Sequence, residues 1–120
     1  MAETILHLAE PDNWAAAIAA GTYTMSTRGR TLAEEGFIHC SRPEQVEGVA
    51  NAFYADLECL VALTIDTELV GAPIVDEPPV PGSQELFPHI YGPLPVTAVV
   101  STLQWTRSSV NWIWNGDAES

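Results

Sequence analysis

Four stretches of the chain have the apolar, β-branched composition of strands. Thr4–Ala9 (TILHLA) and Gly36–Cys40 (GFIHC) are short and mostly apolar, which predicts two strands. Val96–Trp105 alternates in part between apolar and polar residues and predicts a last strand. Cys59–Ile65 (CLVALTI) is apolar almost throughout, which is the pattern of a central strand buried on both faces.

Two helices are predicted between these strands. Pro11 suits the first turn of a helix and Gly21 suits the position just past its end, so we expect a helix over residues 11–20. Ser41 and Glu44 have the spacing of a capping box, which predicts a second helix with Ser41 as its N-cap. In that second helix, apolar residues recur with helical spacing at Val46, Val49, Ala50 and Phe53.

The remaining segments are polar or rich in proline and glycine. Residues 22–25 predict a short strand, and residues 26–35 (STRGRTLAEE) predict a mobile loop. Residues 71–82 hold four prolines and two glycines, so we expect irregular structure with an edge strand at Pro73–Asp76. Strands with only two helices among them predict an α+β domain rather than a doubly wound sheet, and the length predicts one domain over residues 1–120.

The charge of the chain excludes two classes of partner. Four arginines, no lysine and sixteen acidic residues give a net charge of −12, so we expect no nucleic-acid or anionic-membrane partner. No apolar run has the length of a membrane span, and no signal peptide is recognisable, which predicts a cytoplasmic protein. The sequence identifies no protein partner. Cys40 and Cys59 both lie in apolar runs, so we expect two reduced, buried thiols.

The chemistry of the chain centres on its three histidines. The common nucleotide-binding, hydrolase and zinc motifs are absent. His7 and His39 each interrupt an apolar strand, and His89 lies in the segment ELFPHIY. A buried polar side chain without a partner costs about 1–3 kcal/mol. We therefore expect His7 and His39 to lie on the same face of one sheet and open into a cleft, with Glu85, His89 or Tyr91 close by.

Each of these residues also has a purely structural interpretation. A histidine within a strand is often a core residue with both ring nitrogens hydrogen-bonded. Ser41 is explained by an N-cap, Glu85 by solvation and Tyr91 by packing in a turn. Arg42 is the arginine best placed to meet an anion, because it follows FIHCS at an expected helix N-terminus.

Three stretches together resemble a known family: ILHLA at residues 5–9, EEGFIHCSRPEQVEGVAN at 34–51 and GSQELFPHIYGPLPVTAVV at 82–100. They are similar to the small bacterial proteins of the family named domain of unknown function 952. The resemblance implies an ADP-ribosyltransferase-like fold, which is a split or highly curved, mostly antiparallel sheet. It also implies a cleft in which NAD binds as substrate.

The resemblance also implies roles for individual residues. His7 takes the first-strand position that touches NAD, His39 takes the second-strand position that frames the nicotinamide, and Glu85 is the acidic residue that stabilises positive charge on the ribose. The other residues expected to contact a ligand are Ser41, Arg42, His89 and Tyr91. No metal ligand and no resident cofactor is implied.

Three other functions remain open from the sequence. A non-catalytic module can use the same cleft to bind a nucleotide or another small molecule. A metal site can be built from the three histidines with Glu85 as a fourth ligand. An interaction protein can use Trp105, Trp112 and Trp114 as an apolar contact surface. Whether the protein is an enzyme is not decided by the sequence.

Overall fold

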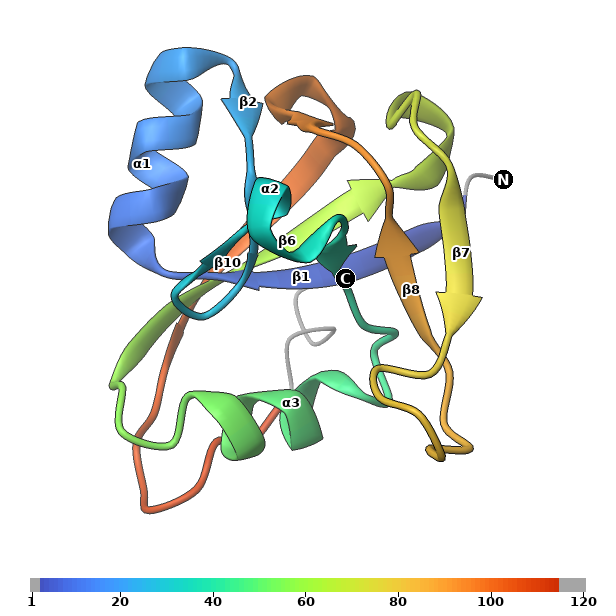
Figure 1. Ribbon diagram of the computed structural model, residues 1–120. Coiled ribbons are helices and arrows are strands. Elements are labelled where there is room, and N and C mark those ends of the chain that lie inside the picture. The colour runs from blue at the N-terminus through green and yellow to red at the C-terminus, as the bar shows by residue number, and fades with distance from the viewer. Residues whose placement is uncertain (1–2, 115–120) are drawn as a thin grey trace.

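The structure, a computed structural model described here for residues 3–114, is built around a three-stranded antiparallel sheet (Figure 1). β6 (Cys59–Asp66) is its central strand, with β1 (Thr4–Ala9) on one side and β10 (Val99–Thr106) on the other. Both edges of β6 are hydrogen-bonded to a neighbouring strand, which confirms the central position predicted from its apolar sequence.

A second three-stranded sheet runs across the direction of β1 (Figure 1). Its middle strand is β8 (Phe87–Ile90), which pairs with β5 (Ile38–His39) and β7 (Ile74–Glu77). β7 is an edge strand, as predicted for this proline-flanked segment. The two sheets meet where Leu6 and Ser41 exchange two backbone hydrogen bonds, each 2.7 Å long.

Short elements complete the framework. Two small antiparallel pairs join β2 to β9 and β3 to β4. The bounds of these strands are Thr22–Tyr23 for β2, Met25–Thr27 for β3, Arg30–Thr31 for β4 and Leu94–Pro95 for β9. Two single turns of 3₁₀-helix, η1 (Thr67–Leu69) and η2 (Val96–Ala98), precede β7 and β10.

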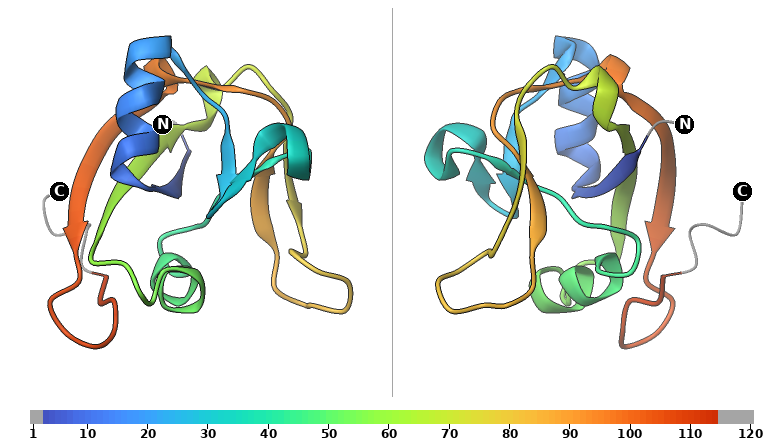
Figure 2. Two further views of the ribbon diagram at one scale, coloured as in Figure 1. Left: turned by 60° about the vertical axis from the view of Figure 1, so that its left-hand side comes forward. Right: turned by 90° about the vertical axis from the view of Figure 1, so that its right-hand side faces the viewer.

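The two longer helices lie apart in the fold (Figures 1 and 2), and each adds residues to a separate hydrophobic core. α1 (Pro11–Ala20) contributes to the core that holds Leu63 and Ile65 of β6, and α3 (Val46–Phe53) to the core that holds Leu60 and Ala62. Since neighbouring side chains of a strand point to opposite faces, β6 is buried on both faces. The fold is therefore α+β with mostly antiparallel sheets, as predicted.

The polar segment 26–35 is structured, which corrects the prediction of a mobile loop. It contains β3, β4 and a third helix, α2 (Leu32–Glu35), where the sequence predicted only two helices. A capping box starts α2: the Thr31 side chain accepts from the Glu34 N–H at 3.2 Å, and Glu34 accepts from the Thr31 N–H at 2.9 Å. These local hydrogen bonds, rather than a stripe of apolar side chains, stabilise the segment.

The capping box predicted at Ser41 is absent. α3 begins five residues later, at Val46, with Gln45 in the N-cap position and no side-chain cap. Ser41 is buried and forms the bridge to Leu6 instead. The Gln45 side-chain oxygen accepts from the Arg42 N–H at 2.9 Å, so the turn before α3 is closed by Gln45 rather than Ser41.

The tryptophans near the C-terminus cover the core, which argues against the interaction surface considered from the sequence. Trp112 is fully buried, packs edge-on against Trp105 and donates from its ring N–H to the Tyr54 carbonyl at 2.8 Å. Trp105 is 6% exposed, and its ring N–H donates to the Ile113 carbonyl at 3.1 Å. Trp114 is only half-buried and also packs against Trp105.

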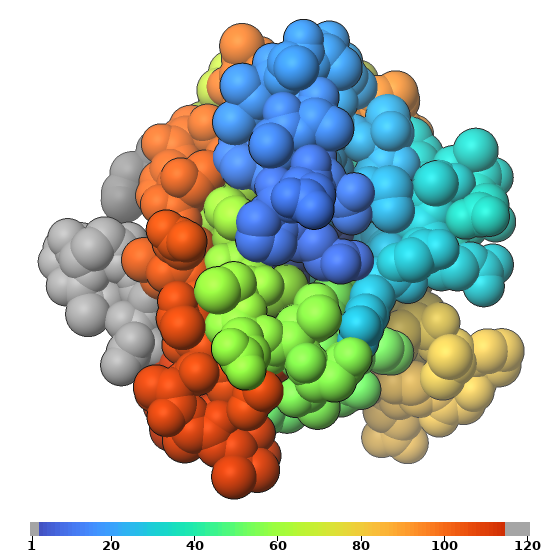
Figure 3. Space-filling view, turned by 90° about the vertical axis from the view of Figure 1, so that its left-hand side faces the viewer, coloured from blue at the N-terminus to red at the C-terminus, as the bar shows by residue number. Residues whose placement is uncertain are grey.

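The two cysteines differ, although the sequence predicted both to be buried. Cys40 is fully buried, and burial raises the pKa of its thiol. Cys59 is exposed at the first position of β6. It lines a surface hollow between the start of α1 and the segment that leads into β6 (Figure 3). Among the described residues, no helix has the length and apolar character to cross a membrane.

Candidate functional site

The junction of the two sheets brings the three histidines together. The register of β5 and β8 places His39 directly opposite His89. The Leu6–Ser41 bridge places β1 beside the residues that follow β5. The His7 ring therefore forms a hydrogen bond with the backbone carbonyl of His39. The expected neighbourhood of His7 and His39 is confirmed, but the expectation that they share one face of one sheet is wrong, because β1 and β5 belong to different sheets.

His7 is a buried, neutral histidine with both ring nitrogens bonded. Its Nδ1 lies 2.6 Å from the His39 carbonyl oxygen and its Nε2 lies 2.7 Å from the Tyr23 hydroxyl. A carbonyl only accepts, so Nδ1 carries the proton and Tyr23 donates to Nε2. Burial lowers the pKa of His7 to about 4, against the opposing effect of the bond to His39. Tyr23, which the sequence did not single out, thus completes the surroundings of His7.

His39, His89 and Glu77 form a line of hydrogen bonds across the second sheet. His39 Nδ1 lies 3.1 Å from His89 Nε2, and His89 Nδ1 lies 2.7 Å from a Glu77 carboxylate oxygen. The Tyr91 hydroxyl donates to the same Glu77 oxygen. These bonds lower the pKa of Glu77, with Tyr91 the larger cause. The ring of His89 also stacks on Phe37, with the ring centres 4.0 Å apart and the planes 9° apart.

His39 lines a hollow between β3, β5, the end of α3 and the loop after β7. The hollow has a volume of about 130 Å³. Its lining residues are Ser26, Thr27, Glu35, Phe37, His39, Phe53, Pro79 and Val80. His39 Nε2 and Ser26 Oγ are both buried without a hydrogen-bond partner among the described residues. We call this hollow the His39 cleft.

A smaller hollow of about 10 Å³ continues inward from the His39 cleft. Ser26, Thr27 and His39 line both hollows, and the inner one also contacts His7 and Ser41. This volume is about that of one water molecule. Ser41 and His7 therefore lie at the inner end of the site, where a larger ligand has no room.

Burial keeps His39 neutral at pH 7. Its pKa is lowered to about 4, chiefly by burial and further by the nearby His89 and His7. In this form one ring nitrogen donates and the other accepts. His39 can therefore offer a hydrogen bond to a ligand at neutral pH without carrying charge.

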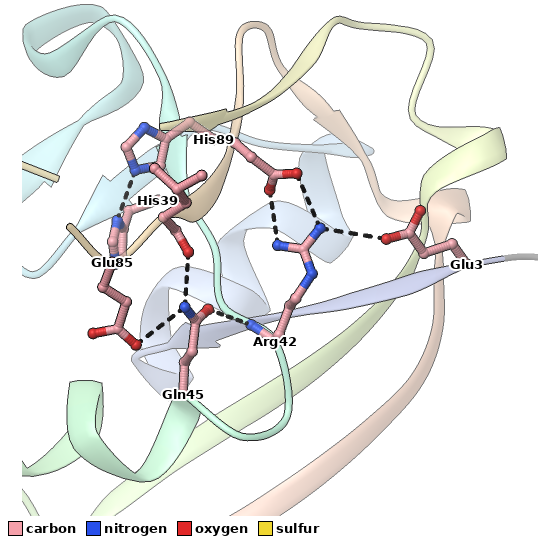
Figure 4. A network of polar contacts seen from close by, with 8 residues as sticks. Glu3, His39, Arg42, Gln45, Glu85 and His89 are labelled. Atoms are coloured by element: carbon pink, nitrogen blue, oxygen red, sulfur yellow. Dashed lines mark hydrogen bonds and ion pairs between the residues drawn. The ribbon is translucent and has the colours of Figure 1, made fainter. Parts of the chain in front are cut away.

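Of the seven predicted site residues, His39 is the one that lines the His39 cleft, and Glu85 and Arg42 contact other polar residues (Figure 4). Glu85 is exposed and accepts from the Gln45 side chain at 3.2 Å. Arg42 pairs with Asp76 at 2.8 Å and with Glu3 at 3.4 Å. Its charge is therefore directed to carboxylates of its own chain.

The sequence did not single out several residues of the site, among them Tyr23, Ser26, Glu35, Phe37 and Glu77. Glu77 follows directly after the predicted edge strand, so its place beside His89 depends on a strand register that no local pattern reveals. Ser26 and Glu35 lie in the segment predicted as a loop. Phe37 alone had a local signal, because strand alternation puts it on the same face as His39.

The histidine metal site has no support in residues 3–114. No group of three or more His, Cys, Asp or Glu side chains there is arranged to hold a metal ion. Both ring nitrogens of His7 already bond to Tyr23 and to a carbonyl, so His7 has no lone pair free for a metal.

Solved structures from one other protein have the same architecture. Two crystal structures of CC0527 from Caulobacter crescentus, one of them of a double mutant, match with TM-scores of 0.80 at 28% sequence identity. The match covers 96% of this chain and 96% of that one. The solution NMR structure of CC0527 matches with a TM-score of 0.76 over 95% of this chain and 94% of that one, again at 28% identity.

The sequence comparisons agree with this likeness. No curated protein matches the chain. The model of the family described as "Protein of unknown function (DUF952)" matches residues 8–102. This range covers most of the chain and includes His39 and His89, so the chain belongs to the DUF952 family.

Proposed function

We propose that the protein binds a small molecule in the His39 cleft and that this molecule is NAD, recognised by its nicotinamide end. The observation that carries the proposal is a pair of buried polar atoms, His39 Nε2 and Ser26 Oγ, that have no hydrogen-bond partner within residues 3–114 and belong to two residues lining one hollow. Folded proteins pair nearly all buried polar groups. A ligand in the hollow would pair both atoms.

The arrangement of the sheets supports NAD as the ligand. The resemblance implies an ADP-ribosyltransferase-like fold, in which NAD lies in the cleft of a split sheet. Here two three-stranded antiparallel sheets are joined by the bridge between Leu6 and Ser41, and the His39 cleft lies beside this junction. In this proposal His39, on β5 and in the lining of the cleft, is the second-strand residue that frames the nicotinamide.

The size and charge of the cleft define how NAD would fit. Pockets for whole drug-sized ligands span about 300–1,000 Å³, so a hollow of about 130 Å³ takes a single ring. The ribose and the phosphates would then lie outside, beyond Phe53, which also lines the neighbouring surface hollow that contains Glu85. Arg28, Arg30 and Arg42 pair with carboxylates of the chain. We therefore expect weak binding of the pyrophosphate.

The reaction that fits this placement is cleavage of the bond between nicotinamide and ribose. The bonding electron pair leaves with nicotinamide, and positive charge develops on the ribose, as in glycoside cleavage. Water or another hydroxyl compound forms the new bond to the ribose carbon, and its proton passes to solvent. A carboxylate near the ribose stabilises the charge. Glu35 lines the cleft and Glu85 lines the neighbouring hollow, so both carboxylates are candidates for this role.

Release of nicotinamide from NAD tests the proposal. We expect the wild-type protein to release nicotinamide. In His39→Asn we expect the rate of release to fall at least about tenfold, because the imidazole nitrogen that accepts a hydrogen bond from the ligand is lost. Glu35→Gln and Glu85→Gln are a matched pair, and the variant with reduced release identifies the carboxylate at the ribose. Equal release by the wild type and His39→Asn would contradict the proposal.

A second candidate is binding without turnover, which one observation favours. Glu35 pairs with Arg30 at 2.8 Å, so its charge is partly neutralised before any ligand arrives. A binding module would be stabilised by NAD or nicotinamide, by about 2.7 kcal/mol at 100 times the dissociation constant. Thermal stabilisation with no release of nicotinamide supports the module, and stabilisation with release supports the enzyme.

A further inference from the structure

We propose that Glu77 and His89 hold the ring proton of His39 on Nδ1, so that a bare Nε2 faces the cleft and selects a neutral ligand with an N–H or O–H donor over an anion. The part of this inference that concerns proton placement stands on the ligand-free structure. The part that concerns the ligand rests on the proposed function.

The direction of each hydrogen bond follows from the one before it. An ionised carboxylate can only accept, so the bond of 2.7 Å to Glu77 puts a proton on His89 Nδ1. In the form of His89 that carries this proton alone, Nε2 has a lone pair. His39 Nδ1, which lies 3.1 Å from that lone pair, must donate to it. The other nitrogen of neutral His39 is therefore an acceptor.

The surroundings hold both rings in place, so this arrangement is fixed before a ligand binds. His89 is 1% exposed and is stacked on Phe37. The Tyr91 hydroxyl is a second donor to the Glu77 oxygen that accepts from His89. The His39 backbone is held through its carbonyl, which accepts from His7 at 2.6 Å. The ring of one histidine is thus oriented by the ring of another and by a carboxylate behind it.

The lining of the cleft decides which ligands suit this acceptor. Glu35 is the charged residue among the lining residues, and it is an anion. An anionic ligand would meet this carboxylate and the lone pair of His39 with no cation in the lining. A neutral group with a donor beside an acceptor, such as a primary amide, can donate to His39 Nε2 and accept from the Ser26 hydroxyl. The geometry therefore favours a neutral amide-bearing ring.

The proton position is measured directly by long-range ¹H–¹⁵N NMR of the histidine rings in the ligand-free protein. We expect Nδ1 of His39 to be protonated in the wild type and in Glu77→Gln, whose side-chain oxygen still accepts from His89. In Glu77→Leu this acceptor is lost, and we expect a change in the proton positions of both histidines. A wild-type spectrum with the His39 proton on Nε2 would overturn the inference, and so would an unchanged spectrum in Glu77→Leu.

Ligand selection is measured with nicotinamide and nicotinate, which share a ring and differ in carrying an amide or a carboxylate. We expect nicotinamide to bind at least about tenfold more tightly, a step that one good hydrogen bond can supply. In Glu77→Leu we expect this preference to shrink, while Glu68→Gln, at an exposed glutamate that does not line the cleft, keeps it. Equal or tighter binding of nicotinate overturns the selection. If neither ring binds while His39 carries its proton on Nδ1, the proposed function and the selection fail together and the proton placement stands.

Discussion

The buried, neutral state of His7 predicts how the stability of the fold depends on pH. The pKa of His7 is about 4 in the folded protein, and it returns to about 6.5 in the unfolded chain. Between these values the unfolded chain binds a proton that the folded protein does not, so falling pH favours unfolding. The stability that neutral His7 contributes is complete above about pH 6.5 and is lost as the pH falls towards 4.

The size of this effect follows from the difference between the two pKa values. One unit corresponds to about 1.36 kcal/mol. Proton linkage then gives a loss of about 2 kcal/mol between pH 7 and 5, and about 3 kcal/mol by pH 4. A domain of this kind has a free energy of unfolding of about 5–15 kcal/mol. The range from pH 7 to 5 is the informative one, because ordinary carboxylates are still mostly ionised there.

The assay is urea unfolding followed by tryptophan fluorescence at several pH values, for the wild type and His7→Asn. The asparagine amide keeps a donor for the His39 carbonyl but does not titrate. We expect the free energy of unfolding of the wild type to fall by about 2 kcal/mol more than that of the variant between pH 7 and 5. His39 titrates in both proteins, so its contribution largely cancels. His7→Gln is the second variant if His7→Asn does not fold. Parallel pH curves for the wild type and the variants would refute the reasoning.

Three further predictions concern stability and reactivity. Cys59 should react with a thiol reagent in the native protein while Cys40 reacts only on unfolding, since Cys59 is exposed and Cys40 is buried. Mass spectrometry of the labelled protein checks this, and labelling of Cys40 in the native protein would contradict it. Thr31→Ala should lower the free energy of unfolding by about 1 kcal/mol in urea titrations, because it removes the capping box of α2; an unchanged midpoint would mean that the capping box adds no stability. Trp112→Ala should lower the free energy of unfolding by about 3–5 kcal/mol, since a fully buried indole is lost. A decrease below about 1 kcal/mol would show that Trp112 does not pack in the core as described.

Much of the fold was readable from the sequence because its strands carry local signals. The apolar run of β6 identified the central strand, and Pro11 and Gly21 correctly predicted where α1 begins and ends. The predictions failed where tertiary contacts override local chemistry. Ser41 has the spacing of a helix cap, but its backbone pairs with Leu6 and its side chain is buried. Cys59 belongs to an apolar run but lies at the exposed start of its strand.

The candidate site was predictable in its histidines but not in their partners. A histidine in an apolar strand stands out in the sequence, so His7 and His39 could be named at once. The register that sets His39 opposite His89, and the turn of chain that brings Glu77 to His89, depend on contacts between distant segments. For the same reason the sequence favoured Glu85 as the carboxylate of the site, while the structure places Glu35 in the His39 cleft. The role of Glu85 stays a prediction.

Titration of ¹⁵N-labelled protein with nicotinamide, followed by amide chemical shifts, tests the central claim most directly. If the His39 cleft is the binding site, the largest changes will fall on Ser26, Thr27, Phe37 and His39, which line it. His39→Asn will abolish these changes while its spectrum remains that of a folded protein. Changes centred on Gln45, Gly48 and Glu85, which line the neighbouring hollow, or no changes at any concentration, would contradict the claim.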